Sequence, residues 1–117
     1  MIRLSLAHTP PSVNGMFRNC AGRGRVKTTR YRQWAAAVSW DIKAQHSGKM
    51  LSGPFEISMI VGRPSKACDL DNRAKAILDI LQSCHVIRDD KLCERITMEW
   101  RKGKGADIEI RPFLEAK

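Results

Sequence analysis

The spacing of apolar residues changes from strand-like to helix-like in the middle of this chain, and this change constrains the fold more than any other feature. Between residues 55 and 61 every second residue is apolar, which predicts a strand with one buried face. A few residues later the apolar positions recur at helical spacing, which predicts a helix from about Asp71 to Gln82. The strand presents Phe55, Ile57, Met59 and Val61, and the helix presents Ala74, Ile77, Leu78 and Leu81. A strand that leads directly into an amphipathic helix indicates a domain in which helices cover a sheet.

The N-terminal half predicts one more strand and one more helix. Alternation over residues 2–6 predicts a strand that ends before Pro10–Pro11, because consecutive prolines cannot continue a ladder. The segment from His8 to Lys27 is expected to be a long loop. A helix should start after an N-cap at Thr28 or Thr29 and stop at Ser47–Gly48. Its apolar stripe is Tyr31, Trp34, Ala35, Val38 and Ile42.

The C-terminal third predicts a hairpin. Arg88–Lys91 reads as a turn or short helix, and His85 is expected in a left-handed position after the second helix. Alternation at 96–100 and 108–110 predicts two strands that pair through the turn at Gly103–Gly105. The predicted order is β-α-β-α-β-β, an α+β fold with two helices packed on a small mixed sheet. Residues 1–117 are expected to form a single domain.

The net positive charge of the chain limits the kinds of molecule that it is expected to bind. The chain has 21 Lys and Arg against 12 Asp and Glu, a formal net charge of +9. Nucleic acid, an anionic membrane face or an acidic protein would match such a charge. No apolar run approaches the roughly 20 residues of a membrane span, and the N-terminus has no long apolar segment typical of a signal peptide.

The cysteines are compatible with a protein that stays in the cytoplasm. Without a secretion signal, the four cysteines are expected to be free thiols in the cytoplasm. A zinc set made from Cys68, Cys84, His85 and Cys93 is a minor alternative, because the spacing matches no familiar zinc pattern.

A small group of carboxylates stands out in this basic chain. Asp69 and Asp71 lie two residues apart where the strand pattern gives way to the helix pattern, and Lys75 follows one turn later. Oxygen ligands of this kind suit Mg²⁺, and a neighbouring lysine can neutralise developing charge. The spacing is equally compatible with structural roles. Asp71 would then cap the helix, Lys75 would pair with Asp71 or Asp79, and Asp90 would be a turn residue beside Asp89.

A combination of motifs resembles the RusA family of Holliday-junction endonucleases. The run Asp69-Leu70-Asp71-Asn72, Lys75 four residues after Asp71, and Asp89-Asp90 beyond the helix occur in the order of that family's signature. The segment Pro10–Gly15 is also similar to the family's N-terminal motif. The similarity spans nearly the whole chain.

The resemblance implies an activity and roles. Asp69, Asp71 and Asp90 would be metal-binding acids, and Lys75 would be the catalytic lysine. The implied reaction is cleavage of four-way junction DNA by a homodimer that uses Mg²⁺, with Mn²⁺ as an alternative metal. The chain departs from the family pattern at His85, where a small residue is usual, and at Ala67–Cys68, which offer no aromatic wedge.

Binding of DNA backbone phosphates is expected from a second set of residues: Asn14, Arg25, Lys27 and Arg30. Each of them is also compatible with ordinary surface solvation. Two other functions stay open at this point. One is a non-catalytic nucleic-acid-binding protein of the same fold, and the other is a protein with an RNA or protein partner and a structural acidic patch.

Overall fold

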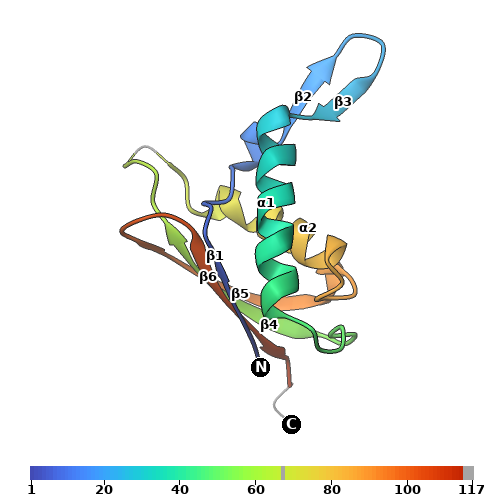
Figure 1. Cartoon of the computed structure of the whole chain (residues 1–117), viewed down its shortest axis with the longest axis vertical. Helices are drawn as coiled ribbons and strands as arrows, with labels where there is room; N and C mark the ends of the chain where they lie inside the picture. The colour runs from blue at the N-terminus through green and yellow to red at the C-terminus, as the bar shows by residue number, and fades with distance from the viewer. Residues whose placement is uncertain (67, 115–117) are drawn as a thin grey trace.

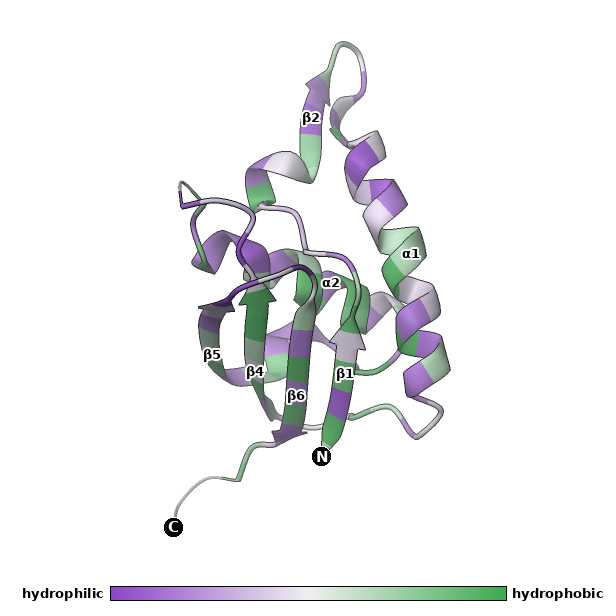
Figure 2. Ribbon diagram, turned by 60° about the vertical axis from the view of Figure 1, so that its left-hand side comes forward, coloured by the Kyte–Doolittle hydropathy of each residue, from purple (hydrophilic) through white to green (hydrophobic). Residues whose placement is uncertain are grey.

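The computed structural model describes residues 1–66 and 68–114. The described residues form a four-stranded sheet of order β1-β6-β4-β5 and a separate two-stranded hairpin. Both α-helices lie on the same face of the larger sheet (Figures 1 and 2). The predicted α+β class is therefore confirmed. None of the described helices is both long enough and apolar enough to pass through a membrane.

Most of the expected elements form where the sequence pattern predicts them. The main sheet contains β1 (Ile2–Leu6), β4 (Phe55–Gly62), β5 (Cys93–Arg101) and β6 (Ala106–Pro112), and the helices are α1 (Thr29–Gln45) and α2 (Ala74–Ser83). Thr28 caps α1, since its side chain accepts a hydrogen bond from the Tyr31 amide. His85 has a φ of 59°, so the expected left-handed position is confirmed.

The core lies between the helices and the near face of the sheet. The predicted inward residues of β4 are buried, as are Tyr31, Trp34, Val38 and Ile42 of α1. In α2 the buried residues are Ala76, Ile77, Ile80 and Leu81, so the buried stripe is turned relative to the predicted one. The opposite face of the sheet is polar, and Figure 2 shows the strands striped by hydropathy, as expected when only one face is covered. On that face Glu56 forms ion pairs with Arg95 and Arg111.

The predicted C-terminal hairpin is wrong. β6 pairs antiparallel with β1 and β4, and β5 pairs in parallel with β4 on its other side. The short turn between β5 and β6 therefore crosses the end of β4. Glycine at position 62 permits this crossing, because a Cβ there would stand 2.4 Å from the Gly103 carbonyl oxygen. The central position buries Ile108 and Ile110, which an edge strand would leave partly exposed.

The expected loop from His8 to Lys27 is also wrong in part. It contains a short 3₁₀ turn, η1 (Val13–Gly15), and an antiparallel hairpin of β2 (Phe17–Cys20) and β3 (Gly24–Lys27). Gly22 and Gly24, with φ of 75° and 71°, allow the tight turn between these strands. The hairpin extends beyond the N-terminal end of α1 (Figure 1). Thr28 anchors its base through a 2.7 Å hydrogen bond from Oγ1 to the Gly15 carbonyl.

Candidate active site

Asp69 and Asp71 lie in the connection that follows the C-terminal end of β4. The chain enters a 3₁₀ turn, η2 (Asp71–Arg73), which continues directly into α2. Both aspartates are exposed. Asp69 Oδ2 accepts a 3.2 Å hydrogen bond from Asn72 Nδ2, which fixes one carboxylate relative to the turn.

The expected capping role of Asp71 is absent from the structure. Leu70 precedes η2 with helical dihedral angles, and neither Leu70 nor Arg73 provides a side-chain cap for the segment that follows it. Asp71 therefore lies inside the first turn and not at the N-cap position before it, where its side chain would accept a hydrogen bond from an amide two or three residues further along. Its carboxylate remains available to a ligand.

Arg73 holds this turn against the N-terminal segment. Its guanidinium is buried, with the residue only 9% exposed, and Nη1 donates a 2.8 Å hydrogen bond to the Pro10 carbonyl. The η1 turn also contacts η2, so the Pro10–Gly15 motif supports the acidic turn directly. Sequence reasoning missed Arg73, because an arginine in a basic chain is expected to be solvated. Arg73 directly precedes the predicted apolar stripe of α2, and this position was the one sign in the sequence that its side chain would be buried.

Lys75 pairs with Asp79 in the described structure. The Lys75 Nζ and Asp79 Oδ1 atoms are 3.3 Å apart across one helical turn. Asp79 also lines a hollow of about 310 Å³ with Lys27, Tyr31, Gln82 and Ser83. Burial, together with the negative charge of Asp79, raises the pKa of the Tyr31 hydroxyl. Of the structural roles considered for Lys75, the ion pair with Asp79 is therefore the one observed. This pair holds the Lys75 ammonium one helical turn away from Asp69 and Asp71.

Asp90 lies at the other end of the sheet. It begins η3 (Asp90–Leu92), immediately before β5, and its amide donates a 3.1 Å hydrogen bond to Gln82 Oε1 near the end of α2. Asp89 caps η3, and the hydrogen bond from the Lys91 amide holds the pKa of the Asp89 carboxyl below its ordinary value. Because β4 and β5 are parallel, Asp69 and Asp71 follow the C-terminal end of one strand, whereas Asp90 precedes the N-terminal end of the other.

The separation is too large for one shared ion. The ten residues of α2, which runs from the acidic turn to the segment that contacts Asp90, span roughly 15 Å at about 1.5 Å per residue. Among the described residues of one chain, no three histidine, cysteine, aspartate or glutamate side chains are grouped closely enough to hold a metal. The structure therefore brings Asp69 and Asp71 together, with Lys75 nearby, and leaves Asp90 apart.

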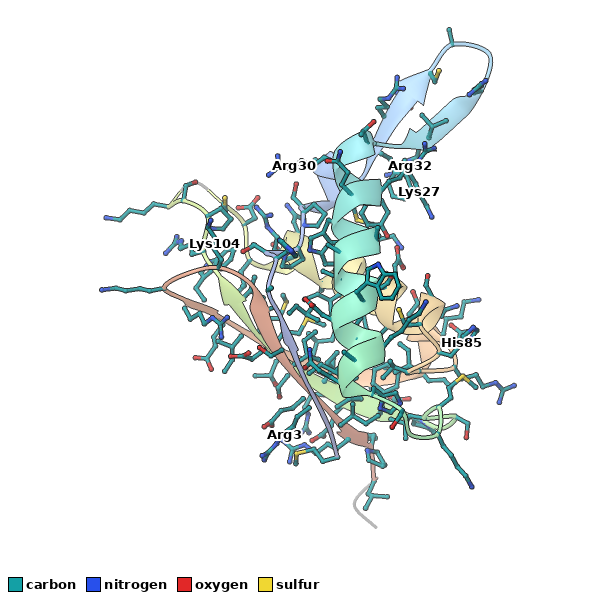
Figure 3. The ribbon with its side chains drawn as sticks, in the orientation of Figure 1. Arg3, Lys27, Arg30, Arg32, His85 and Lys104 are labelled. Carbon is teal, nitrogen blue, oxygen red and sulfur yellow. The ribbon has the colours of Figure 1, made fainter. Side chains whose placement is uncertain are left out.

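The expected phosphate-binding residues surround the base of the hairpin. Asn14 and Arg25 line one hollow of about 440 Å³, and Lys27 and Arg30 each line a different one. The Arg25 guanidinium lies 4.4 Å from the Phe17 ring centroid, a cation–π contact that orients it. Figure 3 shows Lys27 and Arg30 on different sides of the N-terminal end of α1. These four residues thus share one end of the molecule but do not form a single pocket.

The cysteines are free, which confirms the expectation of unpaired thiols. The Cys68 thiol is next to Asp69, and its hydrogen bond with the Ser65 hydroxyl lowers its pKa. Burial raises the pKa of the Cys93 thiol. His85 lies near the end of α2, away from the acidic turn (Figure 3). Of the departures from the family pattern, Ala67 lies outside the described residues.

Two comparisons with known proteins identify the family of this chain. The family model described as endodeoxyribonuclease RusA matches residues 8–111. A crossover junction endodeoxyribonuclease RusA from Aquifex aeolicus (strain VF5) is 27% identical over 116 residues, which cover 96% of this chain and 92% of that protein. The matched region runs from the segment before Pro10 to the last strand and includes the acidic turn, Lys75 and Asp90. The chain therefore belongs to the endodeoxyribonuclease RusA family.

Proposed function

We propose that this protein is a structure-selective DNA endonuclease that resolves Holliday junctions by Mg²⁺-dependent cleavage of phosphodiester bonds. The observation that carries the proposal is the pair of exposed carboxylates at Asp69 and Asp71 in a protein of net charge +9. Membership of the family and the name of the Aquifex relative support the substrate class. The proposal treats residues 1–117 as one functional domain in the cytoplasm.

The donors at the acidic turn fit a hard cation. Asp69 and Asp71 offer carboxylate oxygens that face solvent, which suits a metal that binds few protein ligands and retains several waters. When bound, Mg²⁺ would supply Lewis-acid stabilisation of the charge on the cleaved phosphate, and Mn²⁺ would substitute for it. The hydrogen bond from Asn72 orients one of these carboxylates.

Lys75 would place a positive charge beside the cleaved phosphate. In the described structure Asp79 holds its ammonium at 3.3 Å. The Lys75 side chain is 48% exposed, so it can leave Asp79 for a phosphate oxygen at small cost. Its role in the proposal is stabilisation of the additional negative charge that develops on the phosphate in the transition state.

Asp90 would complete the site only from a second copy of the chain. β5 is an edge strand beside Asp90, and Ile96 in this strand is 44% exposed although it is on the same face as the buried residues of β4. If two copies pair along β5 about a twofold axis, the strands run antiparallel, and the start of one lies beside the end of the other. Asp90 of the second copy would then approach the end of the sheet that carries Asp69 and Asp71. This arrangement gives a homodimer with two composite sites, as two symmetric cuts require.

DNA binding would use the hairpin and the start of α1. The segment from Phe17 to Arg32 contains six arginines and lysines and no acidic residue. Asn14, Arg25, Lys27 and Arg30 are the proposed contacts to backbone phosphates, and they hold the DNA without reading its sequence.

A synthetic mobile four-way junction tests the proposal directly. With Mg²⁺ we expect paired nicks at symmetric positions, and none in EDTA. Asp71→Asn should bind the junction but fail to cut it, whereas Glu109→Gln removes a carboxylate on the polar face of the sheet and should cut normally. Undiminished cutting by the Asp71 variant would exclude the proposed site.

One observation favours a second function. Because the described part of a single chain gathers no three-carboxylate cluster, a protein that stays monomeric would bind junctions without cutting them. Salt-sensitive junction binding by a monomer, with no cleavage in Mg²⁺ or Mn²⁺, would select this alternative.

A further inference from the structure

A basic hollow of about 790 Å³ lies between the start of α1, the segment Ala7–Pro11 and the turn at Gly103–Lys104. We call it the Arg73 pocket. Among the residues that the structure describes, four positively charged side chains line it, and no aspartate or glutamate does. They are Arg30, Arg63, Arg73 and Lys104. The pocket is at the end of the sheet where β4 and β5 finish, the same end as the acidic turn.

Arg73 is the buried member of this group. Nη1 is satisfied by the Pro10 carbonyl, but Nε is buried without a hydrogen-bond partner among the described residues. None of the described residues that line the pocket with Arg73 is a carboxylate, and a buried charge without a partner is unfavourable in a protein interior. An anion in the pocket would compensate this charge.

The remaining cations differ in how they are held. Arg63 is fixed, because Nε and Nη2 donate to the carbonyls of Ser65 and Lys66. Arg30 and Lys104 have no side-chain hydrogen bond or ion pair in the part of the chain that the structure describes. Figure 3 shows both of them left of the N-terminal half of α1, with Arg32 on the opposite side of the helix. Two free cations therefore flank a pocket that contains a fixed positive charge.

The walls of the pocket are apolar as well as basic. Ala37 of α1 and Pro64, which follows β4, line it together with the cations. Inorganic phosphate would use the cations alone, whereas a nucleotide would also cover these apolar groups with its sugar and base. The volume lies within the usual range for small-ligand sites, about 300–1,000 Å³.

We propose that the Arg73 pocket binds a nucleotide, with the phosphate near Arg30, Arg73 and Lys104 and the sugar and base against Ala37 and Pro64. The nucleotide has two sources, a free mononucleotide or an unpaired nucleotide of the DNA strand. The second source rests on the proposed endonuclease function, because Arg73 is two residues from Asp71 and a strand at the acidic turn would pass the pocket.

Calorimetric titration of the full chain with deoxyadenosine monophosphate tests the pocket without any cleavage. The buffer contains EDTA, so that no metal links the phosphate to Asp69 and Asp71. We expect saturable binding that Lys104→Gln and Arg30→Gln each weaken about tenfold, since each removes one charge-assisted contact. Arg32→Gln, a matched charge removal on the same helix, should bind as the wild type does. Absence of saturable binding, or an equal loss in the Arg32 variant, would overturn the proposal.

A junction that carries 2-aminopurine near its crossover separates the two sources. The measurement uses the non-cutting Asp71→Asn variant with and without Lys104→Gln. A fluorescence change that disappears when Lys104→Gln is added supports binding of a nucleotide of the DNA strand. If the junction gives no fluorescence change although the mononucleotide still binds, the pocket takes a free nucleotide. Mononucleotide binding by a protein that never cuts junctions would refute the proposed function and leave the pocket standing.

Discussion

Mixing two inactive variants tests whether the active site is built from two chains. In the composite arrangement, the acidic turn of one protomer faces Asp90 of the other, because the described part of a single chain places these groups at opposite strand ends and gathers no three metal-binding side chains. Asp71→Asn and Asp90→Asn should each abolish cutting alone. In their heterodimer, one site carries both substitutions and the other carries none.

The size of the rescue follows from this geometry. Random reassortment of equal amounts of the two variants makes about half of the dimers heterodimeric, and each of these has one intact site of its two. About a quarter of all sites are therefore restored, and they produce single nicks rather than paired cuts. If all acids of a site came from one chain, no site in the mixture would be intact.

The assay is cleavage of an end-labelled four-way junction after the two variants are unfolded together and refolded. Its control is a mixture of Asp69→Asn with Asp71→Asn, because both changes affect the same end of the sheet and no combination restores a site. Retained junction binding shows that the variants have refolded. Binding without nicking in the Asp71 and Asp90 mixture would refute the composite site.

Three further changes test other parts of the structure. Gly62→Ala should lower the free energy of unfolding by about 1–3 kcal/mol in chemical denaturation, because its Cβ would overlap the crossing turn, whereas Gly53→Ala, with open space around it, should change little. Asp79→Asn should lower the pKa of Tyr31 towards its ordinary value, since the negative charge that helps to raise it is removed; this is the chain's only tyrosine, and an ultraviolet titration with no shift would contradict the contact. Lys27→Gln should reduce the slope of log affinity for junction DNA against log salt by about 0.9, measured by fluorescence anisotropy, and an unchanged slope would remove this residue from the phosphate contacts.

Local patterns predicted the elements whose burial repeats along the chain. The apolar stripe from Tyr31 to Ile42 and the alternation in β4 report burial at every turn or every second residue, so their periods predict them directly. The β2–β3 hairpin escaped prediction because most of its residues are exposed and arginine-rich, which leaves no alternation to detect. Only Gly22 and Gly24 signal its turn.

Long-range pairing was beyond the sequence pattern. The alternation of β6 fits a hairpin with β5 as well as a central position, and only the crossing at Gly62 distinguishes them. The same limit applied to the candidate site. The position of Asp69 and Asp71 after a strand was predictable, but the distance to Asp90 depends on the parallel crossover through α2, and the burial of Arg73 depends on Pro10, 63 residues away.

The strand order also constrains how the chain acquires its structure during synthesis. β6, which emerges from the ribosome after the other three strands of this sheet, is the strand that joins β1 to the rest of the sheet. Ile2 pairs with Ile110, so β1 has no partner in this sheet until residues 106–110 have been made. Pairing over such a distance is slow and leaves apolar strands temporarily uncovered. Nascent chains that lack residues 106–112 should therefore depend on chaperones. Removal of these residues should leave β1 without a hydrogen-bonded neighbour in the sheet.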